Sequence, residues 1–280
     1  MGASVGLVAG LGRLPFELAR GARRRGRRVA AVALEGFADP ALAGEVDACA
    51  RLPVGQLERL FAFLRSEEVK EVVLAGKVPK RLLFEAPGRL QPDATAVSLL
   101  ATLGDRKDDS ILRSFARALE AEGFELVAQA ELAPELLAVE GPLGSVAPTP
   151  AQLADVAFAW PIAKALGALD VGQTVVVEGR AVLALEAIEG TDAAIRRGCE
   201  LGRGGACAVK VAKPQQDPRF DVPAVGLATV RALAAGGGAL LAVEAGRTLL
   251  LEREAMVREA DAAGIALLGV DGRRLPGAGP

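Results

Sequence analysis

Short apolar runs alternate with segments of helical periodicity through the first half of the chain. The apolar runs predict strands at residues 5–9, 29–34, 46–52, 71–75 and 124–128. Helical periodicity predicts helices between them at residues 15–25, 57–66 and 110–122. Strands that alternate with helices in this way favour a parallel sheet covered on both faces. We therefore expect an N-terminal Rossmann-like α/β domain over residues 1–132.

The second half of the chain has its own α/β pattern. A helix is predicted at 151–166, and a hairpin follows, with strands at 174–178 and 181–186 around Gly179-Arg180. After it we expect helices at 191–201, 225–235 and 252–263, with strands at 206–212, 239–243, 248–251 and 265–270. Pro and Gly are frequent at 133–150, which predicts a linker there. Residues 151–280 should form a second, catalytic α/β domain.

Composition removes several classes of chemistry. The 280 residues include no His and no Tyr, which excludes Ser-His-Asp and Cys-His catalysis and any mechanism with a tyrosine acid. Lys and Arg number 33 against 35 Asp and Glu, and the net charge of −2 gives no electrostatic reason to expect nucleic-acid binding. Carboxylates, Lys, Arg, Ser, Thr, backbone amides and a metal ion remain for catalysis.

Cysteine usage and hydropathy indicate a cytoplasmic protein. The three cysteines show no CxxC spacing, and an odd count is simplest to explain by a reducing compartment. Arg13 interrupts the first apolar run, so that the layout of a signal peptide is lacking. The basic run at 23–28 is interpreted as the solvated end of a helix, where cations are favoured by the helix dipole. A second interpretation is peripheral contact with the cytoplasmic face of the inner membrane.

The strongest candidate for a catalytic site is the Pro-rich segment 210–223. It combines Lys210, Lys213, Arg219 and Asp221 between a predicted strand and a predicted helix. Cations beside a carboxylate that can hold a divalent metal are what cleavage of a phosphoanhydride requires. Asp221 could be a metal ligand or could position the attacking water, with Lys213 and Arg219 neutralising charge on the leaving phosphate. The structural alternatives are a helix cap for Asp221 and an ion pair with Asp217 for Arg219.

A second candidate turn joins a predicted strand to the helix at 191–201. It reads Glu189-Gly190-Thr191-Asp192, and a Gly-Thr turn at a helix start presents free amides to an anion. Glu189 and Asp192 are candidate ligands for Mg²⁺, which takes one or two carboxylates together with water and phosphate oxygens. Capping of the helix by Thr191 or Asp192 would explain the same residue types.

The turn Gly10-Leu11-Gly12 follows the first predicted strand, where Rossmann-like folds bind phosphates. An NAD(P)-dependent oxidoreductase is therefore one alternative function, although position 15 is Pro where a dinucleotide fingerprint has its third glycine. A pocket for a nucleotide sugar lined by these amides is the other interpretation. A non-catalytic nucleotide- or lipid-binding protein of the same fold also stays open.

Five motifs, taken together, occur in the order and spacing of a known family. They are Gly10-Leu11-Gly12-Arg13-Leu14-Pro15, Asp108-Asp109, Glu186 through Glu189-Gly190-Thr191-Asp192, Lys210 through Lys213-Pro214, and Arg219-Phe220-Asp221-Val222-Pro223. Over residues 5–271 the chain resembles the LpxI-type UDP-2,3-diacylglucosamine pyrophosphatases of lipid A biosynthesis. One departure is Leu11, which stands where relatives commonly carry another glycine.

The resemblance implies a two-domain homodimer that needs a divalent cation such as Mg²⁺. Such a protein hydrolyses a glycolipid nucleotide, UDP-2,3-diacylglucosamine, to UMP and 2,3-diacylglucosamine 1-phosphate, and encloses the acylated sugar phosphate between its domains. The essential aspartate of the family corresponds to Asp221, so we expect Asp221 to bind the metal with help from Asp192 or Glu189. The residues then expected to bind substrate are Gly10, Gly12, Leu14, Pro15, Gly190, Thr191 and Lys210.

Overall fold

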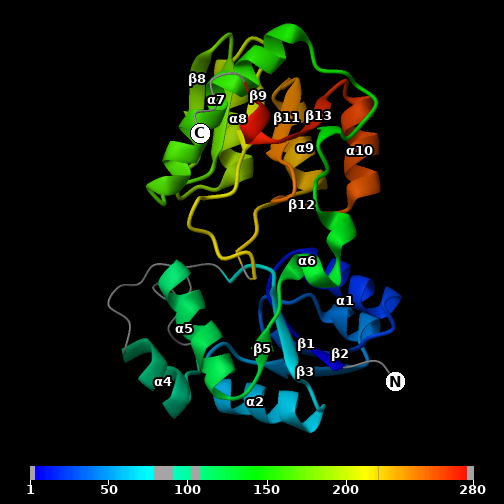
Figure 1. The fold of residues 1–280 in the computed structure, drawn as a ribbon, viewed down its shortest axis with the longest axis vertical. Coiled ribbons are helices and arrows are strands. Elements are labelled where there is room, and N and C mark those ends of the chain that lie inside the picture. The colour runs from blue at the N-terminus through cyan, green and yellow to red at the C-terminus, as the bar shows by residue number, and fades with distance from the viewer. Residues whose placement is uncertain (1–3, 79–90, 102–107, 220, 276–280) are drawn as a thin grey trace. The chain divides into compact units, whose positions relative to one another are not determined.

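The computed structural model describes residues 4–78, 91–101, 108–219 and 221–275. The chain divides into two compact units, Met1–Pro134 and Glu135–Pro280. In Figure 1 the first unit runs from blue to green and the second from green to red. The division falls inside the segment 133–150 that the sequence predicts as a linker.

The first unit is built on a five-stranded parallel sheet with the strand order β3-β2-β1-β4-β5. Its central strands are almost entirely buried, as expected of a parallel sheet with both faces covered. The strands are β1 (Ser4–Ala9), β2 (Arg28–Leu34), β3 (Ala48–Leu52), β4 (Glu71–Ala75) and β5 (Glu125–Leu126). This order confirms the predicted Rossmann-like fold.

Helices surround this sheet, and most of them contact its strands directly. They are α1 (Leu14–Arg24), the 3-10 helix η1 (Pro40–Glu45), α2 (Leu57–Ser66), α4 (Ala94–Ala101), α5 (Asp108–Ala121) and α6 (Gln129–Leu132). Sequence patterns predicted α1, α2 and α5 to within two residues, but α4 and α6 were not predicted. Leu60, Phe61 and Leu64 of α2 are buried together, as their spacing predicts.

Backbone hydrogen bonds join the loop after β1 to the loop after β4. The amide of Gly10 donates to Ala75 O at 2.8 Å, and Leu11 and Lys77 exchange two bonds of 2.9 and 3.0 Å. A Cβ atom on Gly10 would lie 2.7 Å from Lys77 O, and one on Gly76 would lie 2.6 Å from Leu11 O. Gly10 is therefore explained by the close approach of two loops at the topological switch point.

The second unit contains a six-stranded mixed sheet with the order β6-β13-β11-β9-β7-β8. Strands β9, β11 and β13 are parallel, whereas β7 is antiparallel to both β8 and β9. The strands are β6 (Gly141–Pro142), β7 (Thr174–Glu178), β8 (Ala181–Leu185), β9 (Cys207–Lys210), β11 (Leu240–Glu244) and β13 (Ala266–Val270). A separate pair, β10 (Ala224–Val225) and β12 (Leu249–Leu250), is parallel.

Helices cover both faces of this sheet, so the second unit has three layers, with the sheet in the middle (Figure 1). Helix α7 (Pro150–Ala168) packs on one face through Val156, Ala159, Trp160 and Ala163. Helices α8 (Thr191–Leu201), α9 (Leu227–Ala235) and α10 (Arg253–Ala262) pack on the other face through Ile195, Leu233 and Met256, among others. The predicted second α/β domain is thus confirmed, and so is the hairpin β7–β8.

The predicted linker is largely part of the second unit. Strand β6 pairs antiparallel with β13, and the amide of Ala138 donates to Thr248 O at 2.8 Å. Of the predicted segment 133–150, only the first two residues belong to the first unit. The Pro and Gly residues here mark turns that lead into an edge strand, a position where Pro is tolerated.

One edge of the second sheet gathers the ends of strands from distant parts of the sequence. Strands β8, β9 and β11 end there at Leu185, Lys210 and Glu244, and β7 begins there at Thr174, which lies opposite Lys210. Ligands of α/β proteins bind outside the carboxyl ends of such strands. This carboxyl edge is the place to look for the site.

The joined loops of the first unit generate a stability prediction. Gly76→Ala should lower the free energy of unfolding by about 1–3 kcal/mol, because Gly76 has φ +87° and its Cβ would collide with Leu11 O. Thermal unfolding followed by circular dichroism measures the loss. Gly44→Ala is the matched control, since its Cβ would meet no atom within 4 Å. Equal melting temperatures for the two variants would contradict the prediction.

Candidate functional site

A buried polar cluster lies at the carboxyl edge of the second sheet. It consists of Glu186, Thr191 and Lys210, which we call the Lys210 cluster. Lys210 Nζ donates to Thr191 Oγ1 at 2.6 Å, and Thr191 Oγ1 donates to Glu186 Oε1 at 2.8 Å. Lys210 is only 4% exposed and Glu186 8%. Since an isolated buried charge is strongly unfavourable, each of these two charges depends on the other.

The charge of Glu186 is stabilised by its surroundings. Burial alone would raise the pKa of this carboxyl, but the Lys210 ammonium and hydrogen bonds from Thr191 and the Gln173 amide outweigh it. The net effect is a pKa lowered from 4.5. Glu186 is therefore ionised at neutral pH, and it holds the Lys210 ammonium at a fixed place.

The start of helix α8 lies at this cluster. Gly190 is the N-cap residue with φ +84°, and it offers no side chain to the first amides of the helix. Thr191 directs its hydroxyl to Glu186, so the prediction that it caps α8 is wrong. Asp192 accepts a hydrogen bond of 2.9 Å from Thr229 of α9. The first turns of α8 and α9 are therefore side by side, with the positive ends of both helix dipoles at this edge.

The segment 211–223, which we call the 211–223 loop, leaves β9 directly after Lys210. Lys213 Nζ is 2.6 Å from Asp170 Oδ1, and the Lys213 amide donates to Gln216 Oε1 at 2.8 Å. Arg219 pairs with Asp217 through bonds of 2.8 and 3.0 Å. This is the structural alternative that the sequence left open for Arg219. Both predicted catalytic cations thus have a carboxylate partner, Asp170 after α7 for Lys213 and Asp217 of the loop itself for Arg219.

Asp221 lies near the end of the same loop and is half-buried. Its amide donates to Asp217 O at 3.0 Å, and the loop then enters β10. Helix α9 begins six residues later at Leu227, with Gly226 as its N-cap and no side chain as a cap. The alternative in which Asp221 caps this helix is therefore wrong.

The proposed magnesium ligands differ in their surroundings. Glu189 pairs with Arg197 at 2.5 Å and also accepts from the Ala187 amide, so its own turn uses both oxygens. Asp192 uses Oδ1 to accept from Thr229, and Asp221 belongs to the loop. Within the described parts of the chain, no three acidic or thiol side chains form a group that could hold a metal. Mg²⁺ prefers carboxylate oxygens, and both oxygens of Glu189 already have partners, whereas Thr229 occupies only Oδ1 of Asp192.

Of the predicted substrate-binding residues in the first unit, some are buried in the core and one borders open space. Leu14 and Pro15 are buried in the first turn of α1, which makes them core residues. Gly12 has φ +103°, and a Cβ added there would meet no atom within 4 Å. Gly12 is therefore needed for its backbone conformation and leaves an open space at the turn. Asp108 and Asp109 start α5, but their side chains lie outside the described residues.

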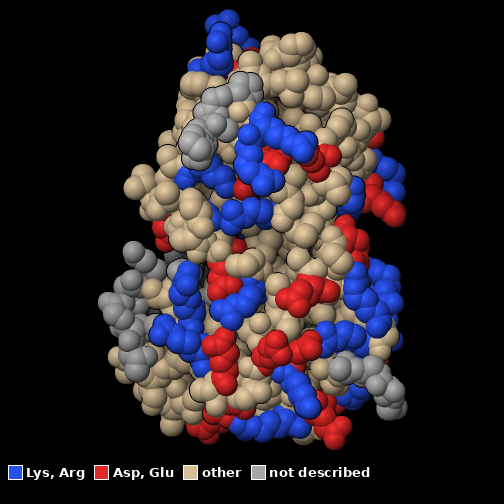
Figure 2. Space-filling model, in the orientation of Figure 1, with Lys and Arg blue, Asp and Glu red and all other residues tan. Residues whose placement is uncertain are grey.

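The basic run at 23–28 contributes less free charge than its sequence suggests. Arg23 and Arg24 occupy the last turn of α1, as predicted. Arg27 pairs with Glu71 at 2.6 Å, and Arg28 pairs with Glu67 at 2.7 Å. Figure 2 shows Lys and Arg interspersed with Asp and Glu on the face that it draws. This arrangement weakens the case for attraction to an anionic surface.

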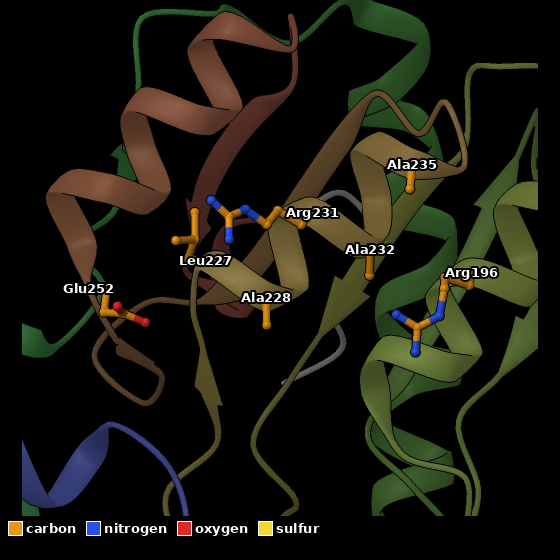
Figure 3. Close-up of a pocket in the computed structure, with 7 residues that line it drawn as sticks. All are labelled: Arg196, Leu227, Ala228, Arg231, Ala232, Ala235 and Glu252. Atoms are coloured by element: carbon orange, nitrogen blue, oxygen red, sulfur yellow. The ribbon is translucent and has the colours of Figure 1, made fainter.

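A pocket of 440 Å³ lies apart from the predicted residues, beside helices α8 and α9. Figure 3 shows Arg196 of α8 on one side of the α9 alanines and Arg231 and Glu252 on the other. Arg231 pairs with Glu259 of α10 at 3.2 Å. None of the predicted site residues lines this pocket, so we do not assign the site to it.

Sequence reasoning missed some partners of the site. Glu186 belongs to one of the motifs, but the sequence alone indicates no role for it, nor for Asp170 or Thr229. One feature of the sequence could have pointed to Glu186: it ends the predicted strand 181–186 and directly follows β8, which ends at the same sheet edge as Lys210. No sequence pattern pointed to Thr229, because its role depends on how α8 and α9 pack.

Comparisons with known proteins agree with this two-unit organisation. The family models of the LpxI N-terminal domain and the LpxI C-terminal domain match residues 4–136 and 139–268. The chain belongs to the LpxI family. It is 39% identical over 283 residues to UDP-2,3-diacylglucosamine pyrophosphatase LpxI of Caulobacter vibrioides, covering 97% of this chain and 99% of that protein.

Similarity to solved structures is much weaker. The biotin carboxylase domain of a thermophilic 2-oxoglutarate carboxylase has a TM-score of 0.27 and 15% identity, covering 72% of this chain and 34% of that one. The corresponding domain of the Hydrogenobacter thermophilus enzyme has a TM-score of 0.28 and 12% identity, covering 63% and 35%. Scores this low add nothing to the assignment of this LpxI family member. Among its described residues, no helix has the length and hydropathy needed to cross a bilayer.

The Lys210 cluster generates a prediction about pH and stability. Glu186→Gln should lower the free energy of unfolding at pH 7 by about 1–3 kcal/mol, because a charged hydrogen-bond acceptor is lost. Because the folded-state pKa of Glu186 lies below 4.5, its contribution is complete above pH 4.5 and is lost as the pH falls through that folded-state value. The difference between wild type and variant should therefore shrink in acid.

Urea unfolding at pH 7 and at pH 3 measures this difference. Glu200→Gln, at an exposed position of the neighbouring helix α8, is the matched control and should change little at either pH. A difference for Glu186→Gln that is the same at both pH values would disprove the linkage.

Proposed function

We propose that this protein hydrolyses the phosphoanhydride of UDP-2,3-diacylglucosamine to UMP and 2,3-diacylglucosamine 1-phosphate. The observation that carries the proposal is 39% identity, over nearly the full length of both chains, to a relative named for this activity. The carboxyl edge of the second sheet supports it, because it combines a buried lysine, a helix start and acidic side chains. The weighed alternatives, an oxidoreductase and a non-catalytic binding protein, have no comparable support.

Binding of the diphosphate falls to the Lys210 cluster and the start of α8. Lys210 Nζ is held by Thr191 Oγ1 at 2.6 Å, so its charge would stay in place when an anion binds. The first amides of α8 have no side-chain cap and can donate to a phosphate oxygen. Together they provide fixed donors, which need no reorganisation as charge develops on the phosphate.

Lys213 and Arg219 would supply movable charge. Each now pairs with an aspartate, Lys213 with Asp170 and Arg219 with Asp217. We infer that a bound diphosphate replaces these aspartates as the partner of Lys213 and Arg219. Arg219 can bind phosphate oxygens in a bidentate way, whereas Lys213 acts as a point charge.

We assign to Asp221 the role of orienting the attacking water. A carboxylate beside a diphosphate is repelled by it, by about 4 kcal/mol for two unit charges 4 Å apart at an effective dielectric of 20. Mg²⁺ bound to Asp221 and Asp192 would offset this repulsion and polarise a phosphate oxygen. We leave Glu189 out of this ligand set because Arg197 and the Ala187 amide occupy it.

We propose that the protein is a cytoplasmic homodimer that meets its acylated substrate at the inner membrane. The support is chemical: two acyl chains keep the substrate in a lipid phase, while its nucleotide part is polar. The paired charges around Arg27 and Arg28 argue against the basic run as the membrane contact.

The role of Asp221 can be tested by one substitution. Asp221→Asn should fold like the wild type and lose about 10³ in kcat, which corresponds to about 4 kcal/mol of barrier lowering. Release of UMP from UDP-2,3-diacylglucosamine with Mg²⁺ present measures the rate. Glu254→Gln, on an exposed position of α10, should retain full activity. A third of wild-type turnover in Asp221→Asn would remove this residue from the mechanism.

The metal requirement gives a separate prediction. Treatment with EDTA should abolish UMP release, and added Mg²⁺ should restore it, because the carboxylates otherwise repel the substrate. Asp192→Asn should shift the midpoint of the Mg²⁺ titration at least about tenfold upwards. Full activity in EDTA would refute the metal model, and an unchanged midpoint in Asp192→Asn would exclude Asp192 as a ligand.

A further inference from the structure

Lys164 and Glu244 form a charged pair that the proposed mechanism does not use. Lys164 lies near the end of α7 and Glu244 at the end of β11, on neighbouring parts of the carboxyl edge. Their atoms Nζ and Oε2 are 2.6 Å apart, and the side chains are 27% and 11% exposed. Both residues line a pocket of 860 Å³, together with Trp160, whose ring centroid is 5.9 Å from Lys164 Nζ.

The pair holds both polar groups of one residue in the loop. The Ala212 amide donates to Glu244 Oε2 at 2.7 Å, and Lys164 Nζ donates to Ala212 O at 2.9 Å. Ala212 stands between the buried end of β9 and Lys213. The backbone is therefore fixed at the residue where the 211–223 loop leaves the sheet. We call Lys164 and Glu244 the Ala212 clamp.

The end of α7 supports the same loop at two further points. Gln215 Nε2 donates to Gly167 O at 3.0 Å, and Lys213 pairs with Asp170. A Cβ atom on Gly167 would lie 3.3 Å from Lys213 Cα, so the loop backbone packs directly against this glycine. Residues 164, 167 and 170 thus contact the loop at 212, 215 and 213.

Stability alone does not account for the clamp. A buried ion pair is often no better for stability than two well-packed apolar residues of similar volume. Its charges do, however, fix a direction: the acid can only accept and the ammonium can only donate. An apolar pair would fill the space but would leave the Ala212 peptide free to turn.

We propose that Lys164 and Glu244 are positioning residues, which set the course of the 211–223 loop and thereby the places of Lys213 and Asp221. This inference rests on the proposed function, since it assumes that the loop carries the chemistry. A misplacement of about 1 Å in a catalytic group can reduce a rate by about 10². The clamp should therefore affect kcat more than substrate binding by Lys210 and α8.

The test compares three substitutions in the full-length protein by UMP release. Lys164→Met should reduce kcat about 10–100-fold, with KM changed by less than about threefold. Glu244→Gln keeps an oxygen that can accept from the Ala212 amide, so its kcat should fall less than that of Lys164→Met. Arg247→Gln is the matched control, because Arg247 is 3.8 Å from Glu244 and lines the same pocket, whereas the side-chain bonds to Ala212 come from Lys164 and Glu244. This variant should keep its kcat within about twofold.

Gly167→Ala keeps the inference testable if Lys164→Met does not fold. This substitution leaves every charge in place, and its Cβ would press on Cα and the side chain of Lys213, so it should also lower kcat by at least about tenfold. A wild-type protein that releases no UMP would defeat the proposed function itself. An active wild type with unchanged kcat in folded Lys164→Met, or in Gly167→Ala, would overturn the positioning role alone. A 10–100-fold rise in KM with unchanged kcat would also overturn the positioning role.

Discussion

The ammonium of Lys210, buried at the end of β9, is the constraint on which the site depends. A buried cation must be matched by an anion and by hydrogen bonds, and here Thr191 and Glu186 provide them. This requirement fixes three segments together: the end of β8, the start of α8 and the end of β9. The geometry at the carboxyl edge follows from charge compensation as much as from strand pairing.

The same edge carries a second charge pair that serves the backbone. Glu244 and Lys164 bind the amide and carbonyl of Ala212, two residues after Lys210. The loop therefore leaves the sheet from a fixed residue and is supported by the end of α7 before it reaches Lys213. Loops that carry chemistry are usually positioned by a rigid scaffold in this way, because their own contacts are few.

Much of this architecture could be predicted from the sequence. The hairpin β7–β8 followed from two short runs around the turn Gly179-Arg180, and helix α8 was predicted with the bounds that the structure gives. The clamp could not be predicted, because Lys164 stands in an almost wholly apolar helix and Glu244 only ends an apolar run. Their partners come from β9 and the loop, far away in sequence. Asp155, the other charged residue of α7, is also buried and accepts from the amides of Gly179 and Arg180, so its partners too are distant in sequence.

Fixed and exchangeable charges are separated in this site. Lys210 cannot leave Thr191 and Glu186 without leaving a buried anion uncompensated, which is costly. Lys213 and Arg219 pair with Asp170 and Asp217 in positions where solvent reaches at least one partner. Such pairs are worth only about 0–1 kcal/mol, so a diphosphate with more charge can replace the aspartates at little cost. In the function proposed above, Asp170 and Asp217 would hold Lys213 and Arg219 until the diphosphate binds, and the buried Lys210 would fix where it binds.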